Sequence, residues 1–104
     1  MSFKNKIFAK FPSKYISYKI KDQSKAREIT RGYKAIRRNN LFDDDFYLEK
    51  YPKVASSGMD PLLHYIFFGF EEGKKPNKTF DGVFYKNHYS DVNINPLVHY
   101  ALYG

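Results

Sequence analysis

The sequence predicts an all-α fold, in which one leading helix is followed by two tandem helix-turn-helix repeats and preceded by a basic N-terminal segment. Three observations predict it: a stretch that recurs at a nearly constant offset, apolar residues at helical spacing, and capping residues at the expected helix ends. A chain of 104 residues forms one small domain. We divide it into a basic leader (1–21), a basic linker helix (22–40) and a repeat domain (41–104) with copies at 41–76 and 80–104.

The repeat is visible in the sequence itself. Residues 42–69 read FDDDFYLEKYPKVASSGMDPLLHYIFFG, and residues 80–104 read FDGVFYKNHYSDVNINPLVHYALYG. Six positions recur at an offset of 38 and five more at an offset of 35, which makes eleven identities. A period in this range is typical of a stacked supersecondary unit.

Each copy is expected to form two short helices. Asp43 and Asp81 are placed as N-caps, each between aromatic residues at the spacing of a hydrophobic staple. The first helix of the first copy is expected to end near Tyr51, before a proline. The second helices begin with Asp60-Pro61 and Asn95-Pro96, and Gly69 and Gly104 are expected to end them through a positive φ.

A longer helix is expected over 24–38, capped by Asp22 or Ser24 and ended by Asn39-Asn40. Its apolar face comprises Ala26, Ile29, Tyr33 and Ile36. Gly32 is expected to weaken it by about 1 kcal/mol relative to alanine. Residues 13–21 fit a short strand, a helix or a linker.

Charge separates the leader and linker from the repeats. Residues 1–40 contain twelve Lys or Arg and two acids, a net charge of +10, whereas residues 41–104 carry a net charge of −3. This asymmetry predicts an anionic partner, which the charge alone leaves open between a membrane surface, a nucleic acid and an acidic polymer.

The leader carries the residues that we expect to contact a membrane. On a helix over 3–11 the apolar residues form one stripe beside lysines, a pattern that suits a membrane interface; the alternative is that the stripe packs on the repeat domain or stays disordered. The set comprises Phe3, Lys4, Lys6, Ile7, Phe8, Lys10 and Phe11. There is no membrane-spanning apolar run, signal-peptide pattern or cysteine. We therefore expect a cytoplasmic location, with a peripheral association at the inner face of the membrane.

The linker helix offers a nucleic-acid alternative through Arg27, Arg31, Lys34, Arg37 and Arg38, although a charged helix face of this kind is also consistent with simple solvation.

Ligand or partner contact is expected at the two PLxHY segments, through His64, Tyr65, His99 and Tyr100. The alternative is that the histidines hydrogen-bond a neighbouring turn and the tyrosines are core rings whose hydroxyls reach the surface. Two histidines without cysteine make a poor metal site, and no phosphate-binding loop or nucleophile motif appears. The sequence predicts no catalytic residue, metal or cofactor.

Asp43-Asp44-Asp45 resembles the DxD metal-nucleotide signature of many glycosyltransferases. The second copy has Asp81-Gly82-Val83 at this place, so only the cap is retained and the sequence favours a capping role.

The repeat resembles a short tandem module found beside glycosyltransferase domains that build bacterial and archaeal surface polysaccharides, including rhamnan- and O-antigen-type chains. The matching residues cover about 30–104. They include Leu41-Phe42-Asp43, Phe46-Tyr47-Leu48, Tyr51-Pro52, Ser57-Gly58, Asp60-Pro61-Leu62, His64-Tyr65, Gly69, Glu72-Gly73-Lys74 and Pro76, and in the second copy Phe80-Asp81, Tyr85, Tyr89, Asp91-Val92, Asn95-Pro96-Leu97, His99-Tyr100 and Gly104. Lys53 replaces the usual acid, and the second copy lacks the Ser-Gly turn.

The resemblance implies a non-catalytic accessory module associated with a glycosyltransferase activity. Such a module would position the enzyme on the membrane, on a partner or on the glycan, and its partner would be a glycosyltransferase or another polysaccharide-assembly protein. The alternatives are a small basic nucleic-acid-binding protein and a structural spacer or oligomerisation unit.

Overall fold

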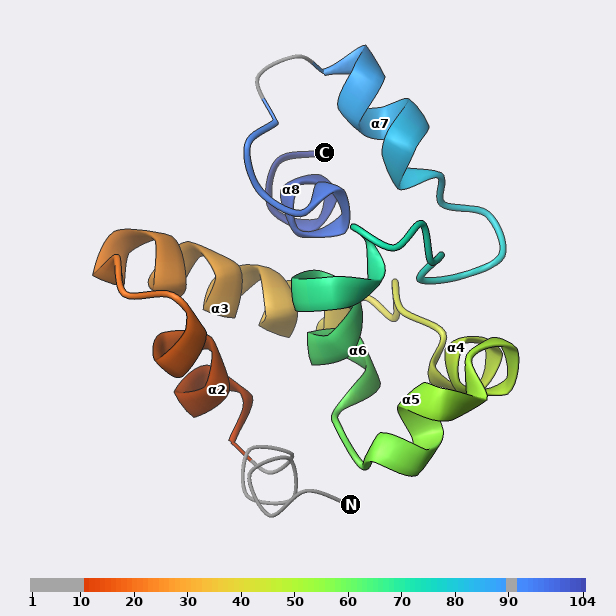
Figure 1. The fold of residues 1–104 in the computed structure, drawn as a ribbon. Helices are drawn as coiled ribbons and strands as arrows, with labels where there is room; N and C mark the ends of the chain where they lie inside the picture. Colours follow the sequence, from red (N-terminus) through yellow and green to blue (C-terminus); the bar gives the residue numbers. More distant parts are fainter. Residues whose placement is uncertain (1–10, 90–91) are drawn as a thin grey trace.

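The structure is a computed structural model, which describes residues 11–89 and 92–104. Within these residues every regular element is helical and no strand occurs, which confirms the all-α class (Figure 1). In chain order the helices are α2 (Pro12–Lys19), α3 (Gln23–Arg38), α4 (Asp44–Lys50), α5 (Pro52–Ser57), α6 (Pro61–His64), the π-helix η1 (Tyr65–Gly69), α7 (Gly82–His88) and α8 (Pro96–Tyr103).

The ambiguous segment after Pro12 is helix α2. Pro12 occupies its first turn, where the missing N–H is no loss. Tyr15 and Ile16 are buried against the next helix, in one cluster with Ala26 and Ile29. Tertiary burial therefore decides a segment whose own pattern left the choice open.

Helix α3 follows the prediction closely. The Asp22 side chain accepts a hydrogen bond from the backbone N–H of Lys25 at 3.1 Å, which settles the cap in favour of Asp22. Of the predicted apolar face, Ala26, Ile29 and Ile36 are buried and Tyr33 is half-buried. The helix ends at Arg38 as expected, with Asn39 as its C-cap, and Asn40 follows with a φ of 55°.

The first helices of the two repeats begin in the same way. Asp43 accepts from the N–H of Phe46 at 2.9 Å, and Asp81 accepts from the N–H of Phe84 at 3.0 Å. The predicted staples are present, with ring centroids 5.0 Å apart for Phe42–Tyr47 and 5.6 Å apart for Phe80–Tyr85. Helix α4 ends at the predicted place, but Pro52 then begins a further helix, α5, which the sequence pattern did not predict. Gly58 terminates α5 with a φ of 74°.

The second helices differ between the copies. The first starts as α6, capped by Asp60, and continues as the π-helix η1, whereas the second is a continuous α-helix capped by Asn95. The prediction that Gly69 and Gly104 end these helices through a positive φ is wrong, because neither has one. In the first copy that conformation falls four residues later, at Gly73, whose φ is 80°.

A closing turn, residues 70–79, folds back onto the start of the first repeat. The Pro76 carbonyl accepts from the N–H of Asp43 at 3.0 Å, and the Asn77 side chain donates to the carbonyl of Leu41 at 2.7 Å. The N–H of Lys75 donates to the hydroxyl of Tyr51 at 3.1 Å. The closing turn therefore belongs structurally to the first repeat.

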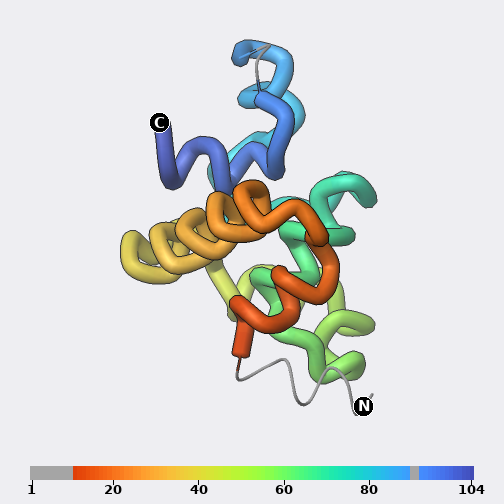
Figure 2. Tube along the Cα trace, turned by 90° about the vertical axis from the view of Figure 1, so that its left-hand side faces the viewer, coloured from red at the N-terminus to blue at the C-terminus, as the bar shows by residue number. Residues whose placement is uncertain are grey.

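The helices surround two hydrophobic clusters that meet on α3. Helix α3 packs against α2 on one side and against α8 on the other, α4 packs against α5 and α6, and α7 packs against α8. Figures 1 and 2 show α7 standing away from the body of the molecule, beyond α8. None of the residues of α7 is fully buried.

Gly32 lies where α3 and α8 come closest. A Cβ atom built at this position would lie 2.4 Å from Cγ1 of Val98, which is itself fully buried. The glycine that weakens the helix in isolation is thus required by the contact between two helices.

We predict that Gly32→Ala destabilises the protein by about 1–3 kcal/mol, because the added methyl overpacks the α3–α8 contact. Urea denaturation of the two proteins measures this change. Helix propensity alone predicts the opposite sign, so an alanine variant that is more stable would contradict the packing that we describe.

Candidate functional site

Each repeat joins its two helices through a tyrosine–histidine pair. The hydroxyl of Tyr47 lies 2.8 Å from Nδ1 of His64, and the hydroxyl of Tyr85 lies 2.8 Å from Nδ1 of His99. These bonds agree with the alternative that the histidines have a shared packing role, although that alternative placed the partner in a neighbouring turn. The partner is a tyrosine on the first helix of the same repeat, seventeen residues before His64 on α4 and fourteen residues before His99 on α7.

Gly69 makes room for the first of these pairs. A Cβ atom at this position would lie 2.1 Å from the hydroxyl oxygen of Tyr47. The absence of a side chain, and not a positive φ, is what this position requires.

A cleft opens beside each tyrosine–histidine pair. Cleft 1, of about 430 Å³, is lined by Lys50, Tyr51, Pro52, Lys53, Val54, Ser57, His64, Glu72 and Lys74. Cleft 2, of about 500 Å³, is lined by Tyr85, Tyr89, His99, Tyr103 and Gly104. Tyr51 and Tyr89 occupy equivalent positions, as do His64 and His99, so the linings of the two clefts share an equivalent tyrosine and histidine.

The two clefts differ in charge. In cleft 1 Lys74 pairs with Glu72 at 2.9 Å, and its Nζ lies 5.1 Å from the ring centre of Tyr51. In cleft 2 the lining is aromatic, and the hydroxyl of Tyr103 donates to Glu28 of helix α3 at 2.5 Å. Cleft 1 therefore combines an apolar surface with a charged pair at its edge, whereas cleft 2 exposes tyrosine hydroxyls beside the rings and is the more polar of the two.

Burial lowers the pKa of His64 below its ordinary value of 6.5, an effect that Glu72 opposes and Lys74 reinforces. His64 is consequently neutral near neutral pH. In this form Nδ1 of His64 and the hydroxyl of Tyr47 can form one ordinary hydrogen bond, in which one of the two groups donates and the other accepts.

The two tyrosines predicted to contact a ligand lie in different environments. Tyr65 is fully buried, as the core alternative predicted, but its hydroxyl is buried as well, so the predictions that this hydroxyl reaches the surface and that Tyr65 contacts a ligand are wrong. Tyr100, its counterpart, is 41% exposed. Both positions hold tyrosine, and they differ in whether other parts of the fold bury the ring.

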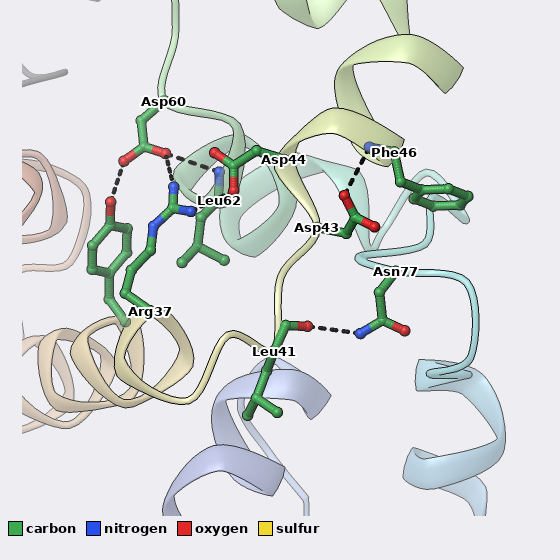
Figure 3. A network of polar contacts seen from close by, with 9 residues as sticks. Arg37, Leu41, Asp43, Asp44, Phe46, Asp60, Leu62 and Asn77 are labelled. Atoms are coloured by element: carbon green, nitrogen blue, oxygen red, sulfur yellow. Dashed lines mark hydrogen bonds and ion pairs between the residues drawn. The ribbon is translucent and has the colours of Figure 1, made fainter.

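Arg37 is engaged in the fold. Its guanidinium donates to Asp44 at 2.5 Å and to Asp60 at 3.0 Å, and Asp60 also accepts from Tyr33 (Figure 3). Asp60 in addition caps α6 through the N–H of Leu62. Among the five predicted nucleic-acid residues, Arg37 therefore has a structural role that the charge pattern did not reveal.

The other four, Arg27, Arg31, Lys34 and Arg38, are exposed. Arg27 and Arg31 line a groove of about 860 Å³ between α2 and α3, together with Lys21. This groove contains no acidic residue among its lining.

The aspartate triplet does not form a metal site in the structure. Asp43 caps α4 and Asp44 pairs with Arg37, as Figure 3 shows. Across residues 11–89 and 92–104, no three His, Asp or Glu side chains gather closely enough to hold a metal ion.

Most of the predicted membrane stripe, Phe3, Lys4, Lys6, Ile7, Phe8 and Lys10, lies outside the described residues. Phe11 is described and is 48% exposed, with Nζ of Lys14 5.0 Å from its ring centre. In the described part of the chain we find no helix with the length and apolarity needed to cross a bilayer.

Comparison with known proteins adds no assignment. No protein-family model, curated protein or solved structure matches the chain. The clefts must therefore be interpreted from their own chemistry.

We predict that Tyr47→Phe destabilises the protein by about 1–2 kcal/mol, because it removes the bond to His64 and leaves a partly buried ring nitrogen unpaired. Tyr65→Phe is the matched control. The Tyr65 hydroxyl is buried without a hydrogen bond, so its removal should leave stability nearly unchanged or raise it. Chemical denaturation of both variants measures the difference, and equal losses would contradict a specific role for the tyrosine–histidine bond.

We predict that His64 makes the protein less stable in acid. Its pKa is lower in the folded than in the unfolded chain, so the unfolded chain binds more protons as the pH falls below about 6.5. This contribution is fully present above that pH and declines as the pH falls toward the folded pKa. The free energy of unfolding between pH 8 and 5 should depend less steeply on pH in His64→Asn, and an unchanged slope would contradict the prediction.

Proposed function

We propose that this chain is a non-catalytic binding module of a surface-polysaccharide glycosyltransferase system, and that it positions the enzyme on the glycan through clefts 1 and 2. The observation that carries the proposal is the duplication of a tyrosine–histidine cleft on one compact body. The resemblance of the repeats to modules found beside such enzymes supports the same class of function.

A duplicated site suits a ligand with repeating chemistry. Two equivalent clefts on a rigid scaffold let one polymer engage both, and the second contact then forms at a high effective concentration. A polysaccharide presents the same sugar unit many times, whereas a single small molecule or one protein epitope gains nothing from a second copy of the site. The duplication therefore favours a polymeric ligand.

The chemistry of the clefts suits sugars. Tyrosine side chains combine an apolar ring, on which the C–H face of a sugar can pack, with a hydroxyl that can bond sugar hydroxyls. Because Nδ1 of each histidine is engaged by a tyrosine, Nε2 is the ring nitrogen left for a ligand. Lys74 and Glu72 add charged partners in cleft 1 alone, so that cleft also suits an acidic sugar.

The hydrogen-bonded histidines act in this proposal as fixed contacts. Nδ1 of each histidine is hydrogen-bonded to a tyrosine of another helix, and this bond fixes the orientation of the ring beside the cleft. Binding and not catalysis is the function that this arrangement supports.

We predict that the full chain binds a rhamnan polysaccharide at least about 100-fold more tightly than the disaccharide of the same sugar, because only the polymer spans both clefts. Isothermal titration calorimetry with both ligands measures the ratio, with dextran as a comparison polymer. Tyr103→Ser, in cleft 2, should remove the advantage of the polymer and leave binding of the disaccharide at cleft 1.

Tyr18→Ser is the matched control, because Tyr18 is 45% exposed on α2 and lines neither cleft. It should leave both affinities unchanged. If neither polysaccharide binds, the glycan part of the proposal is wrong. If binding is lost in Arg27→Ser/Arg31→Ser and not in Tyr103→Ser, the site lies in the basic groove and the clefts are not the binding site.

A further inference from the structure

The first and second repeats contain the same aromatic triad, in which three rings pack on one another. The first triad is Phe42, Tyr47 and Tyr65, and the second is Phe80, Tyr85 and Tyr100. The two tyrosine rings are perpendicular in both, at 87° with centroids 6.2 Å apart in the first and at 90° and 5.9 Å in the second. The internal geometry of the repeat is therefore preserved.

The cover over the two triads differs. All three rings of the first triad are buried, at 3%, 0% and 0% exposed. In the second triad Phe80 and Tyr85 are only partly buried and Tyr100 is 41% exposed. The second triad is thus the face of a repeat that nothing among the described residues covers fully.

The second repeat supplies the cover over the first triad. Leu97 and Val98 of helix α8 share one hydrophobic cluster with the first triad. The amide of Asn95, the cap of that helix, lies beside the Tyr65 hydroxyl, where it opposes part of the rise in pKa that burial causes. The joint between the repeats therefore places a helix cap over a tyrosine of the preceding helix.

The same joint occurs one step earlier in the chain. Tyr33 of helix α3 donates to Asp60, and Asp60 is the cap of α6 in the first repeat. Asp60 and Asn95 occupy equivalent positions, each followed by proline and leucine. In two successive joints, a tyrosine of one unit thus lies beside the Asp-Pro or Asn-Pro cap of the next, with a hydrogen bond in the Tyr33–Asp60 joint and none at Tyr65.

We propose that the second triad is a docking surface for a repeat unit of the same kind, carried by a partner protein, whose second helix begins with Asp-Pro-Leu or Asn-Pro-Leu. Tyr100 continues the series of Tyr33 and Tyr65, so the surface extends an interface that the chain already forms twice. A second copy of this chain does not supply the cap, because Asp60 already accepts from Tyr33 and the Asn95 amide is already buried beside Tyr65 within their own chain. This inference does not depend on glycan binding at the clefts.

The test adds a unit to the full chain. Residues 70–104 are repeated behind Gly104, so that the closing turn and the added unit follow at their natural spacing and stand in for the partner at high effective concentration. In the unextended chain, Tyr100→Ser should change the unfolding equilibrium constant only a few-fold, because the ring is exposed. In the extended chain the same substitution should change it on the order of 100-fold, as expected for loss of a buried aromatic ring.

Two controls separate docking from a general gain in stability. Tyr18→Ser should have the same small effect in both chains. In the second control, Leu97→Asp is introduced only in the added copy of residues 70–104. The effect of Tyr100→Ser should then return to the small value of the unextended chain.

Two results would overturn the proposal. The first is an equal effect of Tyr100→Ser in the unextended and the extended chain. The second is a stable dimer of the unextended chain, found by sedimentation, that Tyr100→Ser converts to monomer, since a second copy would then occupy the surface.

Discussion

Helix α3 is the constraint on which the packing of the rest depends. Ile36 belongs to one hydrophobic cluster, Ala26 and Ile29 belong to the other, and Tyr33 contacts both. A helical repeat cannot bury its apolar face alone and needs a neighbour on each side. With two repeats in the described chain, α3 acts as the neighbour that the first repeat would otherwise lack, and it also receives α8 from the second.

The same helix explains how a chain of high net positive charge folds compactly. Its exposed residues carry most of the cations of the linker, whereas Arg37 turns inward and is neutralised by two carboxylates. Tyr33 shares one of those carboxylates, and burial, reinforced by the bond to Asp60, raises the pKa of Tyr33 to about 12. The network thus keeps one arginine paired at the joint and leaves the repulsive charges in solvent, where water screens them.

Local chemistry was predictable from the sequence. The caps at Asp43, Asp81, Asp60 and Asn95 and the two staples were recognised because a capping residue acts within three positions of itself. Features that depend on distant contacts were missed. Gly32 and Gly69 looked like propensity or turn residues, yet a side chain from another helix fills the space beside each of them. Likewise, repetition marked His64 and His99 as equivalent, but only the fold shows that a tyrosine binds each one, and that Tyr65 is covered while Tyr100 is not.

The closing turn sets where one structural unit ends. By sequence identity the first repeat stops at Gly69, but its backbone is completed only at Asn77, which bonds back to Leu41. A recombination event that joins units at Gly69 would separate a repeat from the segment that seals it, whereas a crossover after Asn77 would transfer a sealed unit. The structural unit and the visible sequence repeat therefore have different boundaries. We expect recombination that adds or removes whole units to join them between Asn77 and Phe80, and not at Gly69.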